Sequence, residues 1–338
     1  MAWYQVKGNE ADVVFSSRIR LARNLEGFAF GQHLKKEESE EIIRRVGAAL
    51  GKSFLQTDME TLPSVAATAL VEQHFASRDF VAAKGPRALF RNDNKSISIM
   101  TPEEDHIRLQ CILPGLALQD AYRFACETDD ALDAALPIAF DERLGYLTHC
   151  PTNLGTGLRA SVMLFLPALT AQGEIASLAH QLAKIGLTMR GLYGEGSSPS
   201  GDLYQISNQV TLGSGEEEIL HKLEEAVQSI IERERALRSA LKGEAAERRA
   251  DRILRAEGTV RYATLLSSEE FFRLFSDLKL GVALGIVKGI THEMLHALLI
   301  GALPATLSQQ AADAPKTSLE RDRARAAFIK QALEVSKI

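Results

Sequence analysis

Two histidines and a glutamate near the C-terminus stand at a spacing that zinc peptidases use. His292, Glu293 and His296, in the stretch THEMLHALL (291–299), follow the order H-E-x-x-H. On a helix this spacing places both imidazoles on one face beside a carboxylate, as a catalytic zinc ion requires. The sequence therefore first raises the question of a metallopeptidase.

A zinc peptidase needs a third ligand, and none stands at a known family spacing. Leu299 and Ala302 occupy the positions where the extended motif would need glycine and histidine. The alternative is an ordinary helix with Met294, Leu295, Leu298 and Leu299 on its apolar face and the histidines toward its edge. We favour this helix, because short motifs often arise by chance, and predict no metal site.

Five arginines in otherwise apolar segments offer a second chemistry: Arg18, Arg20, Arg108, Arg159 and Arg190. Arg18 and Arg20 lie two apart in a β-like run, so both project from one face. In the same way Glu104, His106, Arg108 and Gln110 are expected to share a face. Arg159 follows a Gly-rich turn, and Arg190 precedes a loop rich in Gly and Ser.

Arginine stays charged, so burying it requires a carboxylate or a bound polyanion. A structural salt bridge is the simpler explanation for each arginine taken singly. For the set, several guanidinium groups clamping a phosphate chain is the better interpretation. The sequence has neither the G-x-x-x-x-G-K-[ST] loop nor the H-R-D and D-F-G motifs of protein kinases. Arginines must then bind the phosphates in place of the usual glycine-rich loop and its lysine.

The elements that position these residues indicate an α+β fold. Alternating or β-branched runs at 12–22, 96–100, 106–113 and 202–212 predict strands, whereas apolar residues at helical spacing predict helices at 39–50 and 175–186. Strands without regular βαβ alternation favour a largely antiparallel sheet flanked by helices. From about Glu216 the chain reads as almost wholly helical, and Ser267 and Glu270 have the spacing of a helix cap.

Composition bounds the class of protein. The 338 residues are 46% hydrophobic and carry a net charge of −5, which lacks the basic footprint of a nucleic-acid binder. No apolar run is long enough to span a bilayer and no signal peptide is evident. The three cysteines, an odd number without C-x-x-C spacing, favour a reducing compartment. We expect a cytoplasmic protein without direct nucleic-acid or membrane binding.

Several stretches, in order along the chain, resemble the catalytic domain of the phosphagen (guanidino) kinases. They are SSRIRLARN, EEDHIR, CPTNLGTGLRASV, RGLYGEGS and YQISNQVTLG. The resemblance is strongest to the bacterial branch of that family, which phosphorylates arginine on proteins. The short lead before Ser16 leaves no room for the helical N-terminal domain of the small-metabolite enzymes, which implies a site open to a protein-borne arginine.

The resemblance implies roles for individual residues. Glu104 corresponds to the carboxylate that holds the substrate guanidinium and removes its proton, Glu195 to a second carboxylate, and Cys150 to a neighbour of that guanidinium. Pro102 departs from the family pattern, which has Asn there. Mg²⁺ is expected to arrive with ATP. The implied ATP-binding residues are Ser16, Ser17, Arg18, Ile19, Arg20, His74, Arg108, Arg159, Ala160, Ser161, Val162, Met163, Arg190, Gly191, Leu192, Tyr193, Gly194 and Glu195.

A second motif, RDRARA (321–326), resembles a phosphoarginine-binding pocket formed by Arg321, Asp322, Arg325 and Ala326. The resemblance further implies residues 12–240 as the catalytic domain and 244–338 as a helical domain for dimerisation and regulation. It also implies an McsA-type activator, a Clp ATPase that degrades marked proteins, and a CtsR-type repressor. A kinase of free arginine and a phosphoarginine-binding adaptor with weak catalysis remain alternatives.

Overall fold

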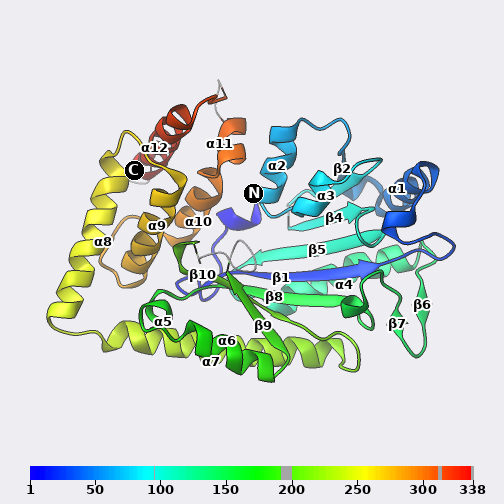
Figure 1. Ribbon diagram of the computed structural model, residues 1–338, viewed down its shortest axis with the longest axis horizontal. Helices are drawn as coiled ribbons and strands as arrows, with labels where there is room; N and C mark the ends of the chain where they lie inside the picture. Colours follow the sequence, from blue (N-terminus) through cyan, green and yellow to red (C-terminus); the bar gives the residue numbers. More distant parts are fainter. Residues whose placement is uncertain (95, 192–199, 311–313, 336–338) are drawn as a thin grey trace.

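An eight-stranded antiparallel sheet forms the centre of the molecule, in the strand order β2-β3-β4-β5-β1-β8-β10-β9 (Figure 1). The computed structural model describes residues 1–94, 96–191, 200–310 and 314–335. The expected α+β class with an antiparallel sheet is confirmed. The strands are β1 Val14–Arg23, β2 Phe54–Asp58, β3 Ala88–Asn92, β4 Ile97–Thr101, β5 Ile107–Pro114, β8 Leu158–Phe165, β9 Leu187–Gly191 and β10 Leu203–Asn208, with a separate hairpin of β6 Phe140–Asp141 and β7 Gly145–Tyr146.

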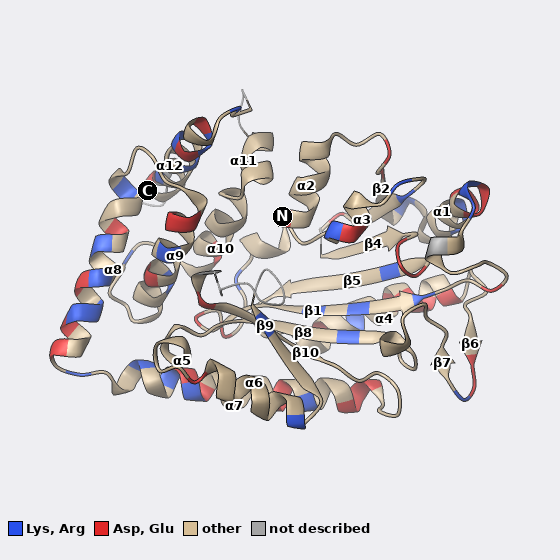
Figure 2. Cartoon of the chain, viewed as in Figure 1, with Lys and Arg blue, Asp and Glu red and all other residues tan. Residues whose placement is uncertain are grey.

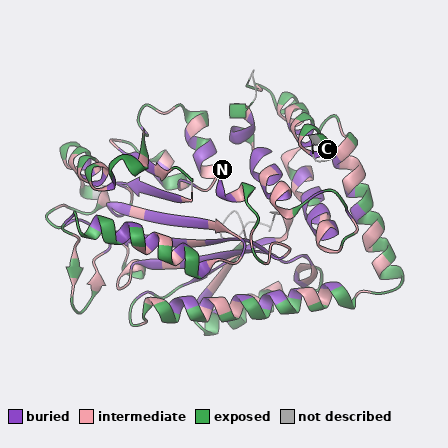
Figure 3. Ribbon diagram, turned by 180° about the vertical axis from the view of Figure 1, so that it is seen from behind, coloured by how far each residue is buried: buried purple, intermediate pink, exposed green. Residues whose placement is uncertain are grey.

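One face of the sheet packs against helices. Ile19 and Leu21 of the central strand β1 are buried on this face, in one core with side chains from the covering helices. Viewed from behind, these helices lie across the sheet with their buried sides toward it (Figure 3). They are α1 Lys36–Leu50, α4 Leu118–Asp133, α6 Ile175–Lys184 and α7 Glu216–Ala240, with the short α5 Pro167–Ala171 beside α7.

A second core joins the end of the other sheet face to the C-terminal helices. Trp3, Phe15 and Phe165 pack in it together with residues of α2 Ser64–Glu72 and α3 Arg78–Ala82. The region after α7 is helical, as expected. Its helices are α8 Glu244–Tyr262, α9 Ser268–Ala283, α10 His292–Gly301, α11 Pro304–Gln310 and α12 Ser318–Val335. The domain limits 12–240 and 244–338 stay a prediction.

All four predicted strands are found, with ends that differ from the predicted ones. The strand expected at 106–113 begins at Ile107, and the one expected at 202–212 ends at Asn208. The Asn208 side chain itself bonds to the backbone, donating to Leu158 O and Val210 O and accepting from Ala160 N. An amide side chain that takes over ladder partners ends a strand, because it competes with the neighbouring backbone. No helix in the described part of the chain is long and apolar enough to cross a membrane.

Candidate active site

All five predicted arginines lie on the sheet face opposite α1 and α4. Arg20 stands opposite Arg159 across the β1–β8 pair, and Arg190 of β9 is opposite Gln205 of β10. Arg108 of β5 and Arg18 belong to the same face by the two-residue alternation of strands. Figure 2 shows the basic residues as blue bands on β1, β5 and β8, side by side across the sheet. The expectation that Arg18 and Arg20 share one surface is therefore met.

The guanidinium groups on this face repel one another. Burial, followed by the charges of Arg108 and Arg159, lowers the pKa of Arg18 to about 10. Burial and the same neighbours, with Arg18, also hold the pKa of Arg20 well below its usual value. Burial and then Arg190 and Arg108 lower the pKa of Arg159. So many like charges in a partly desolvated place are stable together when an anion binds among them.

The hydrogen bonds of these arginines leave buried donors without partners. The Nε atoms of Arg20 and Arg159 are buried and unpaired within the described part of the chain. Arg18 donates to the neutral Gln205 Oε1 at 3.0 Å, and Arg159 donates to Ser207 Oγ at 3.3 Å. Buried polar groups normally have partners, so these orphaned N–H groups fit phosphate oxygens, which are strong acceptors.

Arg108 differs from its neighbours, because it pairs with Glu103 at 2.5 Å. Glu103 also accepts a hydrogen bond from Ser77 Oγ, which ties it to the start of α3. The sequence did not single out Glu103. The feature that could have identified Glu103 is its place two residues before the buried pair Asp105–His106, in a segment too acidic to be an ordinary strand.

Glu104 lies at the edge of the arginine face in a bend, not in a strand. Its side chain is largely exposed. Loss of some surrounding water to neighbouring protein atoms, followed by the negative charge of Asp105, raises the pKa of its carboxyl, against the opposing effect of Arg108. The bend is fixed by Asp105, which accepts from Asn24 Nδ2 and from His149 N, both at 2.7 Å. The same carboxylate therefore brings the segment before Cys150 close to Glu104.

The predicted alternation of Glu104, His106, Arg108 and Gln110 on one face is wrong at its N-terminal end. His106 is fully buried among the loop residues after β1. Its Nδ1 accepts from Leu25 N at 3.0 Å, and its Nε2 lies 2.7 Å from Ala29 O. The periodicity fails because residues 102–106 are bends, in which successive side chains do not alternate.

Cys150 lies beside the arginine face, at the start of the CPTNLGTG turn. It is near enough to Arg159 to act on the pKa of that guanidinium, as the weakest of its influences, and its Sγ is 3.0 Å from Thr152 Oγ1. The turn needs its glycines: Gly155 has φ +103°, and a Cβ there would lie 2.4 Å from Thr211 O. Only glycine fits a position that combines a left-handed backbone with such a close approach.

His74 lies at the opposite end of the arginine face. It lines a small cavity with Ser16, Arg18, Ser161 and Met163. Burial, with a further contribution from the Arg18 charge, lowers the pKa of the imidazole to about 4. His74 is therefore neutral at physiological pH and does not add to the positive charge.

Several residues predicted to contact the nucleotide have side chains that point away from the arginine face. The side chains of Ile19, Ala160 and Val162 are in the helix-covered core, and Ser17 Oγ donates to Gly115 O at 2.9 Å. These residues can reach a ligand only through their backbone. Gly191 ends β9, whereas Leu192, Tyr193, Gly194 and Glu195 lie outside the described residues.

The predicted phosphoarginine pocket is on α12, far from the sheet arginines in the fold (Figure 1). Arg325 is buried and donates to Leu266 O at 2.7 Å, to Ala302 O at 3.0 Å and to Asp322 Oδ1 at 2.9 Å. Most of the Arg325 guanidinium therefore already holds the helix in place, and the phosphoarginine pocket stays a prediction.

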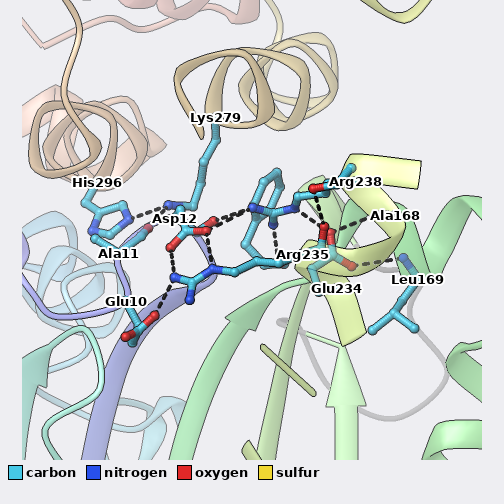
Figure 4. Close-up of polar contacts among 12 residues, drawn as sticks. Glu10, Ala11, Asp12, Ala168, Leu169, Glu234, Arg235, Arg238, Lys279 and His296 are labelled. Atoms are coloured by element: carbon cyan, nitrogen blue, oxygen red, sulfur yellow. Dashed lines mark hydrogen bonds and ion pairs between the residues drawn. The ribbon is translucent and has the colours of Figure 1, made fainter. Parts of the chain in front are cut away.

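The H-E-x-x-H motif begins α10, as expected for a helix, but His296 is not at its edge. His296 is 2% exposed, with its ring 4.0 Å from the Phe15 ring. Its Nε2 is 3.0 Å from Nζ of Lys279, which donates to Ala11 O at 2.6 Å (Figure 4). The imidazole is thus committed to a buried polar network at the sheet end.

Comparison with known proteins agrees with this geometry. Residues 38–237 match the family described as ATP:guanido phosphotransferase, C-terminal catalytic domain, and residues 246–337 match the protein-arginine kinase McsB C-terminal domain. The chain is 43% identical to a protein-arginine kinase of Symbiobacterium thermophilum, covering 98% of this chain and 96% of that protein. It is 42% identical to one of Pelotomaculum thermopropionicum, covering 97% and 94%.

Solved structures point the same way. Lombricine kinase matches with a TM-score of 0.61 and 26% identity, covering 72% of this chain and 71% of that one. A duplicated taurocyamine kinase from Schistosoma mansoni with bound transition state analog components matches with a TM-score of 0.62 and 26% identity, covering 80% of this chain and 40% of that one.

Proposed function

Since the chain belongs to the protein-arginine kinases of the ATP:guanido phosphotransferase family, we propose that its arginine face holds the phosphates of ATP while Glu104 acts on the substrate guanidinium. The observation that carries this proposal is the pair of buried, unpaired Nε donors of Arg20 and Arg159. They lie on adjacent strands in direct register, so one phosphate chain can satisfy both.

The arginines supply charge neutralisation for phosphoryl transfer. Arg18, Arg20, Arg108, Arg159 and Arg190 line the path of the triphosphate, and their positive charge offsets the negative charge that builds up on the transferred group. No covalent intermediate on the protein is needed. Mg²⁺ comes with ATP and is held chiefly by phosphate and water, since the site is formed mainly of cations.

Glu104 prepares the nucleophile. A protonated guanidinium is a poor nucleophile because its lone pairs are delocalised, so a carboxylate must orient it and accept a proton as the N–P bond forms and the bond to ADP breaks. The raised pKa of Glu104 suits a base that takes this proton. Cys150 is proposed to lie beside the guanidinium, and Glu195 to act as a second carboxylate.

The biological setting is also part of the proposal. Phosphoarginine would mark proteins in the cytoplasm for a Clp ATPase and its protease during stress, with an McsA-type activator and a CtsR-type repressor as partners. The helical C-terminal region would support a homodimer and bind phosphoarginine at Arg321, Asp322, Arg325 and Ala326.

The test combines ATP, Mg²⁺ and either a protein substrate or free arginine, with phosphoarginine detected by mass spectrometry. We expect labelling of the protein substrate. Arg20→Gln should lower the affinity for ATP at least tenfold, whereas the control Arg143→Gln, at an exposed position in the β6–β7 turn, should match the wild type. Labelling of free arginine alone would contradict the protein substrate, and normal ATP affinity in Arg20→Gln would contradict the phosphate site.

A further inference from the structure

A large cavity lies where the catalytic part of the chain meets its C-terminal helices. Its volume is about 710 Å³, within the range of small-molecule pockets. One wall comes from α2 and α3, through Val71 and Val81, and the other from the C-terminal region, through Phe272, Ile300 and Leu303. Figure 1 shows α10 and α11 beside α2, at the end of the sheet where this cavity lies.

The cavity lies next to the arginine face, because the two share lining residues. His74 and Met163 line it and also line the small cavity that contains Arg18 and Ser161. A ligand whose phosphates lie on Arg20 and Arg159 would thus point its other end past His74 into the larger space. For a nucleoside triphosphate, that other end is the base.

The chemistry of the lining fits a base rather than a phosphate. Most of the lining residues are apolar, and the neutral imidazole of His74 can lie against an aromatic ring without repelling it. An apolar pocket with a few polar groups is typical of sites for flat, uncharged ring systems.

The C-terminal wall is fixed in place before any ligand binds. The Glu72 carboxylate of α2 accepts from Ala305 N at 2.9 Å, and from Thr306 N and Thr306 Oγ1 at 2.6 and 2.8 Å, at the start of α11. A carboxylate at a helix start is stabilising, because it meets unpaired N–H groups and the positive end of the helix dipole. Leu303 directly precedes this helix, so its side chain is held at the cavity.

We propose that the C-terminal helices form one wall of the nucleotide-base pocket, with Phe272, Ile300 and Leu303 setting the affinity for ATP although they belong to the region outside the matched catalytic domain. This rests on the proposed binding of the phosphates at the arginine face. It extends that proposal, because part of the base pocket comes from helices that contribute none of the five arginines on the sheet face.

The test replaces Leu303 by tryptophan, which fills the space that the base would occupy. We measure binding of ATP and of inorganic triphosphate, each with Mg²⁺, to the full-length chain. Leu303→Trp should weaken ATP binding roughly tenfold or more and leave triphosphate binding unchanged. Leu319→Trp is the matched control, because Leu319 is 51% exposed on α12 and does not line the cavity.

Val81→Trp, from the opposite wall, guards against a folding defect in the first variant. Melting temperatures identify any variant that is not folded. Unchanged ATP affinity in the folded tryptophan variants overturns the inference, as does an equal loss of ATP and triphosphate. If only the proposed phosphate site is wrong, the wild-type protein would bind ATP but not triphosphate. A loss of ATP affinity in Leu303→Trp would then still support the base pocket.

Discussion

At the scale of single residues, replacing one carboxylate oxygen of Glu104 should change the rate of phosphoryl transfer. Glu104→Gln keeps the shape and the hydrogen-bonding capacity of the side chain but cannot accept the guanidinium proton. We expect the rate of transfer to fall by about 100-fold or more, with ATP affinity unchanged because the arginines are untouched. Rapid-quench measurement of phosphoarginine, beside ATP titration, checks both parts.

The pH profile gives an independent reading of Glu104. Its pKa is raised above 4.5 by burial and by Asp105, so kcat/KM should fall as pH drops through that raised value, where the base becomes protonated. The acid limb should be absent from the residual activity of Glu104→Gln and present in the control Glu142→Gln, an exposed glutamate of the β6–β7 turn. An identical limb in all three proteins would mean that another group is titrating.

The site residues that could be found from the sequence were those with a periodic signal, such as the sheet arginines, and those in motifs that resemble the family, such as Glu104 and Cys150. Arg18 and Arg20, two apart in an apolar strand, predicted a shared surface. Asp105 and Asn24 gave no such signal, because their roles come from a hydrogen bond between segments that are distant in the chain. His106 was misplaced for a different reason: the alternation of a strand was extended into residues 102–106, which form bends.

At the scale of elements, one buried guanidinium supplies hydrogen bonds that attach α12 to its neighbours. Arg325 binds the carbonyl oxygens of Leu266 and Ala302, which tie α12 to the segment before α9 and to the end of α10. Arg325→Met leaves both acceptors buried without a donor, so we expect a loss of about 3 kcal/mol in the free energy of unfolding. Urea denaturation measures it.

The same helix contains the controls. Arg323 is exposed, and Arg323→Met should change stability by less than about 0.5 kcal/mol. Arg321→Ala should also leave stability intact, which makes it the cleaner variant for testing the proposed phosphoarginine pocket. A stable Arg325→Met protein that lacks phosphoarginine binding would instead show that Arg325 serves the ligand more than the fold.

At the scale of the whole molecule, a polar network that is buried at Glu234, Arg238, Lys279 and His296 joins the N-terminal segment, α7 and the C-terminal helices (Figure 4). Arg235 Nε donates to Asp12 Oδ2 at 3.0 Å, and Arg238 Nε donates to Glu234 Oε1 at 2.7 Å. The overall class of fold was predictable from hydrophobic periodicity. This junction was not, since the H-E-x-x-H pattern says nothing about the lysine that its second histidine meets.

Lys279 should give the junction a pH-dependent stability. Burial, and then the charge of Arg238, lower the pKa of Lys279 from 10.5 to about 7, against the opposing effect of Asp12. Its other neighbours are His296, Ala11 O and the Phe165 ring, and burial keeps the imidazoles of His296 and His292 neutral by lowering their pKa values, that of His292 to about 4. Lys279 is therefore the group of this cluster that titrates near neutrality.

The direction of the change in stability with pH follows from the number of protons bound in each state. Between pH 7 and 10.5 the unfolded chain keeps the lysine proton that the folded protein has released, so stability rises with pH in this window. From pH 7 to 9 we expect this lysine to contribute a gain of about 2 kcal/mol in the free energy of unfolding. Lys279→Met should lose that gain, whereas Lys288→Met, at an exposed position before α10, should keep it. Denaturation of the three proteins at each pH makes the comparison, and a parallel rise in Lys279→Met would assign the pH dependence to other groups.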